Sequence, residues 1–264
     1  MRKPFNELTF TDDYMFRAVL RENIDICRGL IELILNIEVD HLEFKGDDFT
    51  LSAGTDARSI RLDVYLKDDA GTVYDIEMEN WTKPELPKRT RYYQSMLDVN
   101  HLDPNTAFPD LPDSYILFIC SSDPFEDGLS KYEFTDMCRQ IPMKELGTGA
   151  TKVFINAKGS RKDLSQEMQD FLDYLCDNNP RNELTKDIEA TIAYVRKSDD
   201  KRSEYMFFEL SMMDARREGI NEGRAEAKLD DVGKLVASGL ADEEKACEVL
   251  GVSFEEYKKY KDSK

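Results

Sequence analysis

The stretch RLDVYLKDDAGTVYDIEMEN, residues 61–80, constrains the fold most, because apolar and polar residues alternate on both sides of a short turn. This period of two predicts a β-hairpin. Successive side chains of a strand point to opposite faces of the sheet. One face then carries apolar side chains, namely Leu62, Val64, Leu66, Tyr74, Ile76 and Met78. The other face is largely acidic, with Asp63, Asp75, Glu77 and Glu79.

A turn that is symmetric about Ala70 places Asp63 directly opposite Glu77. Two carboxylates at such positions repel each other, and burial under neighbouring helices raises the cost further. A raised pKa is one remedy, and a divalent cation is another. Mg²⁺ and Mn²⁺ prefer carboxylate, carbonyl and water oxygens, so Asp63, Glu77 and the main-chain carbonyl of Met78 are the candidate ligands.

A second interpretation of the acidic face stays open at this stage. The same symmetric register places Arg61 opposite Glu79, and the two side chains can then form an ion pair. The remaining carboxylates would simply be solvated, as is common in an acidic protein. A bulge in either strand would also shift the pairing.

The pattern along the rest of the chain predicts an α/β core followed by helices. Helices are expected at 10–35, with a break and a cap at Asn23, at 87–102, and after Gln166. Strands are expected at 41–44, 60–66, 73–78, 115–120, 132–134 and 152–155. The continuous apolar run 115–120 is typical of a buried central strand. We place a boundary near Gly159–Lys162, which gives a core at 1–160 and a helical region at 161–264.

Charge limits the partners of this chain. The formal net charge is -18, which argues against unspecific adhesion to nucleic acid or to an anionic membrane. A DNA contact therefore needs a local basic patch, and LPKRTRYYQ at 86–94 is one, with Lys88, Arg89 and Arg91 and no acid. On a helix, Lys88, Arg91, Tyr92 and Ser95 share one face, which could clamp phosphates. The alternative is a solvated helix whose arginines offset nearby acids.

The cysteine and histidine content indicates the redox state of the compartment and limits the kinds of metal site that the chain can form. Five scattered cysteines without a CxxC pair are typical of a reducing cytoplasm. With only two histidines, a zinc site of the usual kind is not expected, so any metal should be bound by oxygen. The sequence contains no apolar run of about 18 residues, and no membrane span is expected.

Four stretches together resemble the PD-(D/E)XK nuclease superfamily, in its transposase-like branch of recombination-promoting nucleases. They are TFTDDYMFRAVL, the hairpin at 61–80, LPKRTRYYQSMLD and the charged tail REGINEGRAEAK. The resemblance implies a restriction-endonuclease-like mixed β-sheet flanked by helices. It also implies a Mg²⁺-dependent DNA endonuclease, with Mn²⁺ as a substitute, linked to recombination or mobile elements.

Within this resemblance, Asp63 matches the metal-binding Asp and Glu77 the acidic position of the motif. Glu79 stands where the superfamily usually has Lys and this branch often has Gln. A Glu there can ligate a second metal or act as a base, or it can mark a lost activity, which would leave an inactive binding protein. The helical Glu of the first motif corresponds to Glu22 or Glu32.

The basic segment supplies the expected DNA contacts of such an enzyme. They are Lys88, Arg89, Arg91, Tyr92 and Gln94, where Gln94 could orient a site group and Lys88 could replace the missing motif lysine. Trp81, which follows the second strand, is expected to act as a lid or a packing residue.

The C-terminal region offers two interpretations for each of its features. Gly219 and Gly223 lie in a charged helical stretch that is either a solvated tether or a helix–helix contact in a homodimer. Residues 241–257 are predicted to form two short helices around Gly251, and their pattern resembles a small helix-turn-helix. The second of these helices is rich in acids, which favours a packing or oligomerisation module over sequence recognition.

Overall fold

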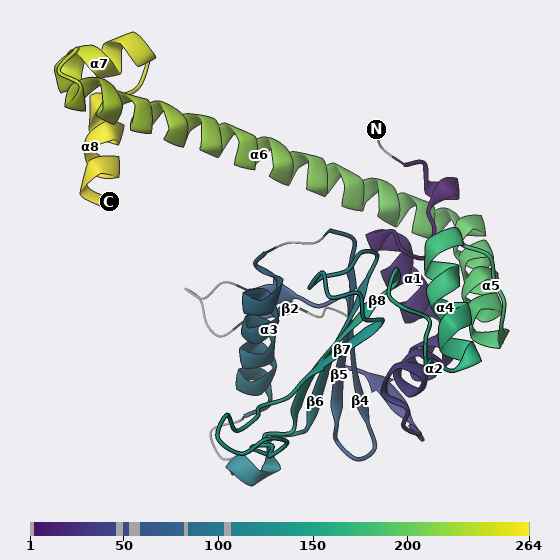
Figure 1. Cartoon of the computed structure of the whole chain (residues 1–264). Coiled ribbons are helices and arrows are strands. Elements are labelled where there is room, and N and C mark those ends of the chain that lie inside the picture. Colours follow the sequence, from purple (N-terminus) through teal and green to yellow (C-terminus); the bar gives the residue numbers. More distant parts are fainter. Residues whose placement is uncertain (1–2, 46–49, 53–58, 82–83, 103–106, 264) are drawn as a thin grey trace. The chain divides into compact units, whose positions relative to one another are not determined.

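A six-stranded mixed sheet forms the centre of the computed structural model, which describes residues 3–45, 50–52, 59–81, 84–102 and 107–263 (Figure 1). In spatial order its strands are β1 (Leu42–Phe44), β4 (Val64–Asp68), β5 (Val73–Glu79), β6 (Ser114–Cys120), β8 (Ala150–Asn156) and β7 (Lys131–Phe134). The strands β5, β6 and β8 run parallel, and the other neighbouring pairs are antiparallel. A separate two-stranded ribbon pairs β2 (Thr50–Leu51) with β3 (Ile60–Arg61).

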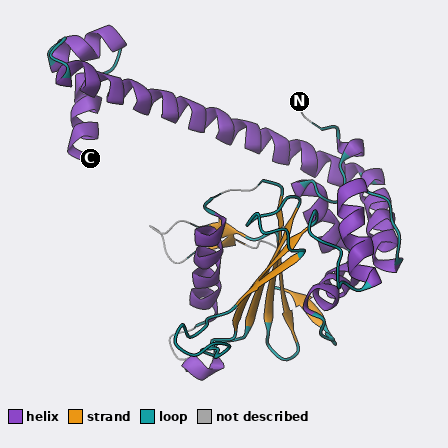
Figure 2. Cartoon of the chain, in the orientation of Figure 1, coloured by secondary structure: helices purple, strands orange, loops and turns teal. Residues whose placement is uncertain are grey.

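Helices cover both faces of the large sheet (Figure 2). On one side lies α3 (Leu86–His101), and on the other lie α1 (Asp13–Glu22), α2 (Ile24–Leu35), α4 (Gln166–Asp177) and α5 (Glu183–Lys197). Two short 3₁₀ helices, Phe5–Glu7 and Phe108–Asp110, complete this part. A mixed sheet between helices confirms the predicted fold class.

The register of the central hairpin is the one that the sequence predicts. Val64 pairs with Ile76 and Tyr65 with Asp75, so the turn is symmetric about Ala70. Gly71 takes a left-handed conformation at φ 94°, which glycine adopts without a steric penalty. The tight turn therefore holds the two strands in fixed alignment.

The first predicted strand of the hairpin is interrupted, and this overturns one expectation. The chain leaves strand geometry at 62–63, so Ile60 and Arg61 pair with β2 instead of continuing beside β5. Arg61 lies opposite Thr50, and it cannot pair with Glu79 across the hairpin as the symmetric register suggested.

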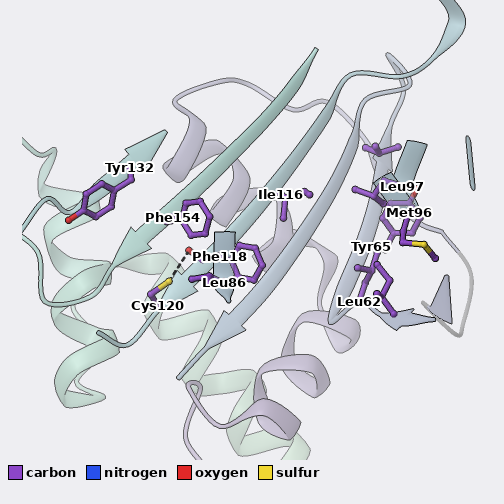
Figure 3. Close-up of a cluster of buried hydrophobic side chains, with 12 residues drawn as sticks. Leu62, Tyr65, Leu86, Met96, Leu97, Ile116, Phe118, Cys120, Tyr132 and Phe154 are labelled. Carbon is purple, nitrogen blue, oxygen red and sulfur yellow. Dashed lines mark hydrogen bonds between the residues drawn. The ribbon is translucent and has the colours of Figure 1, made fainter. Parts of the chain in front are cut away.

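Residues from several strands of the large sheet and from α3 fill the core on the α3 side of the sheet (Figure 3). Phe118 and Phe154 stack with ring centroids 5.3 Å apart, and Leu86, Met96 and Leu97 of α3 pack in the same cluster. Burial of this apolar surface fixes α3 against the face of the sheet that also carries the β5 acids Asp75, Glu77 and Glu79.

The chain divides later than the boundary expected near Gly159–Lys162. One compact unit runs from residue 1 to Lys201 and the other from Arg202 to 264. The difference arises because α4 and α5 pack against α1 and α2 and so belong to the first unit.

The second unit comprises most of α6 (Asp199–Ala237) with α7 (Glu243–Leu250) and α8 (Phe254–Ser263). Its small core contains Val232, Ala246, Cys247 and Tyr257. Gly251 ends α7 in a left-handed conformation at φ 62°, at the junction predicted between the two short helices.

None of the helices within the described residues combines the length and apolar character needed to cross a membrane.

Candidate active site

Two carboxylates from neighbouring segments of the hairpin are locked together by reciprocal bonds to the main chain. The backbone N–H of Asp63 donates to Glu77 Oε1 at 2.8 Å, and the backbone N–H of Met78 donates to Asp63 Oδ2 at 3.2 Å. Both carboxyl groups therefore project from the same side of the hairpin. The break in the strand at 62–63 is what frees the Asp63 side chain and N–H for these contacts.

The acidic face is buried. Relative exposure is 0% for Asp75, 6% for Glu77 and 6% for Glu79, because α3 packs over this side of β5. The alternative of a solvated acidic face is therefore wrong. Three carboxyl groups in a row along β5, with Asp63 beside them, must be neutralised by protons, by protein cations or by a bound ion.

Burial raises the pKa values of this cluster. It raises the pKa of Asp63 to about 6, against the opposing effect of the Arg17 guanidinium. It also raises the pKa of Asp75 and of Glu77 well above their ordinary ranges, and in Glu77 the charges of Asp75 and Asp63 add to the effect. The cluster therefore favours protons, or another cation, over three free negative charges.

Asp75 has the least compensated position in the site. As carboxylate oxygens, Asp75 Oδ1 and Oδ2 have no hydrogen-bond partner within the described part of the chain. When either Asp75 or Glu77 carries a proton, the two carboxyl groups can hydrogen-bond to each other, which links their titrations.

The first helix contributes two charges that the sequence patterns did not assign to the site. Arg17 Nη1 of α1 lies 3.8 Å from Asp63 Oδ1, and both side chains are largely buried. Asp13, in the first turn of α1, also raises the pKa of Asp63. The Nδ2 of Asn80 donates to Asp13 Oδ1 at 3.2 Å and so joins this helix to the end of β5.

The helical acids proposed from the family resemblance lie elsewhere. Glu32 Oε1 accepts from the backbone N–H of Val39 at 3.0 Å, and Glu22 lies 3.9 Å from Lys201 Nζ. Neither contact involves the carboxylates of the hairpin. Asp13 is instead the helical acid whose charge acts on Asp63.

Glu79 is paired with a cation from α3. Arg89 Nη2 contacts Glu79 Oε2 in a salt bridge, and the backbone N–H of Trp81 donates to Glu79 Oε1 at 3.1 Å. Burial lowers the pKa of Arg89, but the hydrogen bond and charge of Glu79 outweigh it, and the pKa is raised. Glu79 stands at the motif position where the superfamily usually has Lys. The positive charge beside this position comes from Arg89, and not from Lys88 as the sequence suggested.

Trp81 stands beside this salt bridge but does not pack into the core. Its side chain is 74% exposed, although its main chain is tied to Glu79. The expectation that Trp81 packs inside the protein is therefore wrong, and the role of a lid stays a prediction.

The basic helix α3 presents its cations on two flanks. Lys88, Arg89 and Tyr92 line a cleft of about 590 Å³ together with Arg61. Arg91 lines a second cleft of about 410 Å³. The single face predicted for Lys88, Arg91, Tyr92 and Ser95 is thus divided, because the apolar contacts of α3 turn these positions toward different sides.

The first of these clefts adjoins the acidic cluster. Arg89 both lines the cleft and binds Glu79, and the charge of Arg61 acts on Asp63. A cleft with three cations beside buried carboxylates suits an anionic polymer whose backbone must approach an acidic site. Gln94 lies on the other flank, where its Nε2 donates to Asp98 and Ser114, each at 2.8 Å.

The carboxylate oxygens of Asp63, Glu77 and Asp75 suit a hard cation, although they do not by themselves form a complete coordination shell. Within the described residues, no three carboxylate, histidine or cysteine side chains form a ready-made metal site. Magnesium is typically held by one or two carboxylates and completes its shell with water and substrate oxygens. Asp63 and Glu77 match that arrangement, and the unpartnered oxygens of Asp75 lie in the same cluster.

The comparisons with known proteins agree with this geometry. Residues 10–139 match the family model described as PD-(D/E)XK nuclease family transposase. The match spans α1, the hairpin and α3, and hence Arg17, Asp63, Glu77 and Arg89. No curated protein and no solved structure matches the chain. The match supports a nuclease-like or transposase-like role, and residues 10–139, just under half of the chain, are similar to the PD-(D/E)XK nuclease family transposases.

Proposed function

We propose that this protein is a DNA endonuclease that hydrolyses phosphodiester bonds with the help of a divalent cation. The observation that supports the proposal most is the pair of the partly buried Asp63 and the buried Glu77, fixed by reciprocal main-chain bonds and flanked by the buried Asp75. Such a cluster is costly when it is ionised without compensation, and a dication removes that cost.

Asp63 and Glu77 would hold Mg²⁺ or Mn²⁺, and the carbonyl oxygen of Met78 is the third candidate ligand. A cation at this place neutralises charge on the phosphate and lowers the pKa of water. The reciprocal bonds to the backbone N–H groups of Asp63 and Met78 keep both carboxylates in one orientation, so little rearrangement is needed when the cation binds.

The cationic cleft would hold the DNA strand next to this site. Lys88 and Arg61 contact phosphates, and the rings of Tyr92 and Tyr93 line the same cleft. Each phosphate contact made by a cation adds a salt-dependent contribution to affinity, and this offsets the repulsion expected from a chain of net charge -18.

Glu79 has a conditional role in this proposal. While Arg89 holds it, Glu79 is neither a free ligand nor a free base. A DNA phosphate that attracts Arg89 would release Glu79, which could then bind a second cation or accept a proton from water. We also propose that the cleavage is linked to DNA recombination or mobile elements, and the transposase in the family description supports this setting.

Plasmid cleavage tests the proposal. Purified wild type, Asp63→Asn and Glu77→Gln are incubated with supercoiled plasmid and Mg²⁺ or Mn²⁺, next to Asp69→Asn. Asp69 lies exposed in the turn of the same hairpin and serves as the matched control. We expect nicking by wild type and Asp69→Asn, loss of nicking in the two site variants, and none in EDTA.

A second readout separates an inactive protein from a wrong site. Mg²⁺ should raise the melting temperature of wild type but not of Glu77→Gln, because only an intact site binds the cation. Nicking that is equal in all variants contradicts the proposed site. Absence of both nicking and cation stabilisation would favour the alternative of an inactive nuclease fold that works as a binding protein.

A further inference from the structure

The second cleft beside α3 has a composition that the proposed hydrolytic site does not use. It lies between α3 and the strands β7 and β8 and has a volume of about 410 Å³. Aromatic rings form one wall, and the other lining residues include two cations, one amide, hydroxyl side chains, a proline and one acid. This volume is in the range of sites for small organic ligands.

The aromatic wall is rigid and partly open to solvent. The Phe134 ring is 45% exposed, with its centroid 5.2 Å from that of Phe125 and 5.7 Å from that of Phe154. Phe125 and Phe154 are themselves 5.0 Å apart in an edge contact. These contacts hold Phe134 in place, so a flat ligand could stack on it with little loss of side-chain entropy.

The polar lining is suited to an anion joined to a flat ring. Arg91 and Lys152 line the cleft, and neither is paired with a carboxylate among the described residues. The one acid in the lining, Asp136, accepts a hydrogen bond from the Thr148 hydroxyl at 2.9 Å. The cleft therefore differs in charge from the acidic chain around it.

Gln94 supplies an unused hydrogen-bond acceptor in the same wall. The side chain is buried, and Asp98, as an acceptor, fixes the orientation of the amide by taking a bond from Nε2. Gln94 Oε1 then has no partner in the part of the chain that the structure describes. A buried acceptor without a partner is costly, and an amino group of a nucleobase is a donor that would satisfy it.

We infer that this cleft holds a single unpaired nucleotide of a DNA strand. The base stacks on Phe134 and meets Gln94, and the adjoining phosphate lies at Arg91 and Lys152. The inference rests on the proposed function, since DNA is the substrate it assigns. The faces of a base in a duplex are covered by its stacked neighbours, so the Phe134 ring can stack only on a base of single-stranded DNA or on a base displaced from a duplex.

Binding of oligonucleotides in EDTA tests the inference without any cleavage. The probe is a single strand of about 12 nucleotides with one 2-aminopurine, compared with its duplex, by fluorescence anisotropy and by quenching of the modified base. Phe134→Ala should weaken single-strand binding about tenfold and remove the quenching, because base stacking on the ring is lost. Phe134→Tyr should keep both, since it retains a ring.

Two further variants complete the experiment. Arg91→Gln should weaken binding and flatten its salt dependence, because one phosphate contact is lost. Met143→Ala is the control, because Met143 is highly exposed and does not line the cleft. Folding of each variant is checked by its melting temperature.

Unchanged single-strand affinity and quenching in Phe134→Ala would overturn the inference. An equal loss for single strand and duplex would also overturn it, because the Phe134 ring would then not distinguish an unpaired base from a paired one. The proposed function is tested independently of the nucleotide cleft. If wild type nicks plasmid while Phe134→Ala binds like wild type, only the nucleotide cleft is wrong. If Asp63→Asn still nicks while Phe134→Ala loses single-strand binding, only the hydrolytic site is wrong.

Discussion

The backbone N–H of Asp63 donates to the carboxylate of Glu77 across 2.8 Å, while the carboxylate of Asp63 accepts from the next residue of the opposing strand. Each acid is thus oriented by the strand that carries the other. The pair is held in place by main-chain groups rather than by flexible side chains.

The raised pKa of Asp63 predicts how pH affects the metal-free protein. The ordinary pKa of an Asp is about 4, and that of Asp63 in the folded protein is about 6. The unfolded chain therefore binds fewer protons at this group between these values, and its contribution to stability is lost as pH rises from about 4 through about 6. We expect Asp63→Asn to be more stable than wild type at about pH 7, by on the order of 2 kcal/mol.

Chemical denaturation of both proteins in EDTA at several pH values measures this difference. It should shrink as pH falls from about 6 to about 4 and be smallest below about pH 3, where Asp63 is protonated in both states. A constant difference across the range would contradict the raised pKa. Asp69→Asn again serves as the control, since Asp69 is exposed in the hairpin turn.

The salt bridge between Glu79 and Arg89 should be strongly coupled. Arg89→Met leaves the buried Glu79 without its cation, and we expect a loss of about 2 kcal/mol in the free energy of unfolding. This value is below that of a fully buried pair because Arg89 is partly exposed. Adding Glu79→Gln to the same protein should recover most of the loss, because no unpaired charge then remains.

A double-mutant cycle by urea denaturation measures the coupling of this pair. Additive effects of Glu79→Gln and Arg89→Met would show that the contact contributes nothing. In the nicking assay, Glu79→Gln also reports whether this acid takes part in cleavage.

Lys88 should contribute one phosphate contact to duplex binding. Lys88→Ala is expected to reduce the slope of log affinity against log salt by about 1 and to weaken binding to different sequences equally. Lys162, which is highly exposed and lines neither cleft beside α3, provides the control substitution Lys162→Ala. An identical slope for Lys88→Ala and wild type would remove Lys88 from the DNA contacts.

Gly159 is expected to tolerate no side chain. A Cβ at this position would lie 2.4 Å from Ser130 Cα and 2.5 Å from the carbonyl oxygen of Leu129. Both are backbone atoms, so the turn after β8 must move, and Gly159→Ala should cost about 2 kcal/mol or more. Gly219→Ala is the contrasting change, because a Cβ there would meet no atom within 4 Å beyond the neighbouring backbone of its own helix, and alanine is the better helix former.

Thermal unfolding followed by circular dichroism distinguishes these two glycine variants. Gly159→Ala should lower the transition temperature, and Gly219→Ala should leave it unchanged or raise it. A wild-type transition in Gly159→Ala would mean that the segment before β7 relaxes at no cost.

The sequence by itself determined the hairpin and the acids on one face, because a period of two sends alternate side chains of a strand to opposite faces, and it suggested a register that holds in the hairpin but not at Arg61. It also indicated the basic helix and the family. The tertiary structure alone decided that the acidic face is buried, since alternation is the same whether the polar side faces water or α3. It brought Arg17 to Asp63 and Arg89 to Glu79 and divided the cations of α3 between two clefts. These contacts join elements far apart in the chain, and the packing that creates them leaves no local pattern in the residues involved.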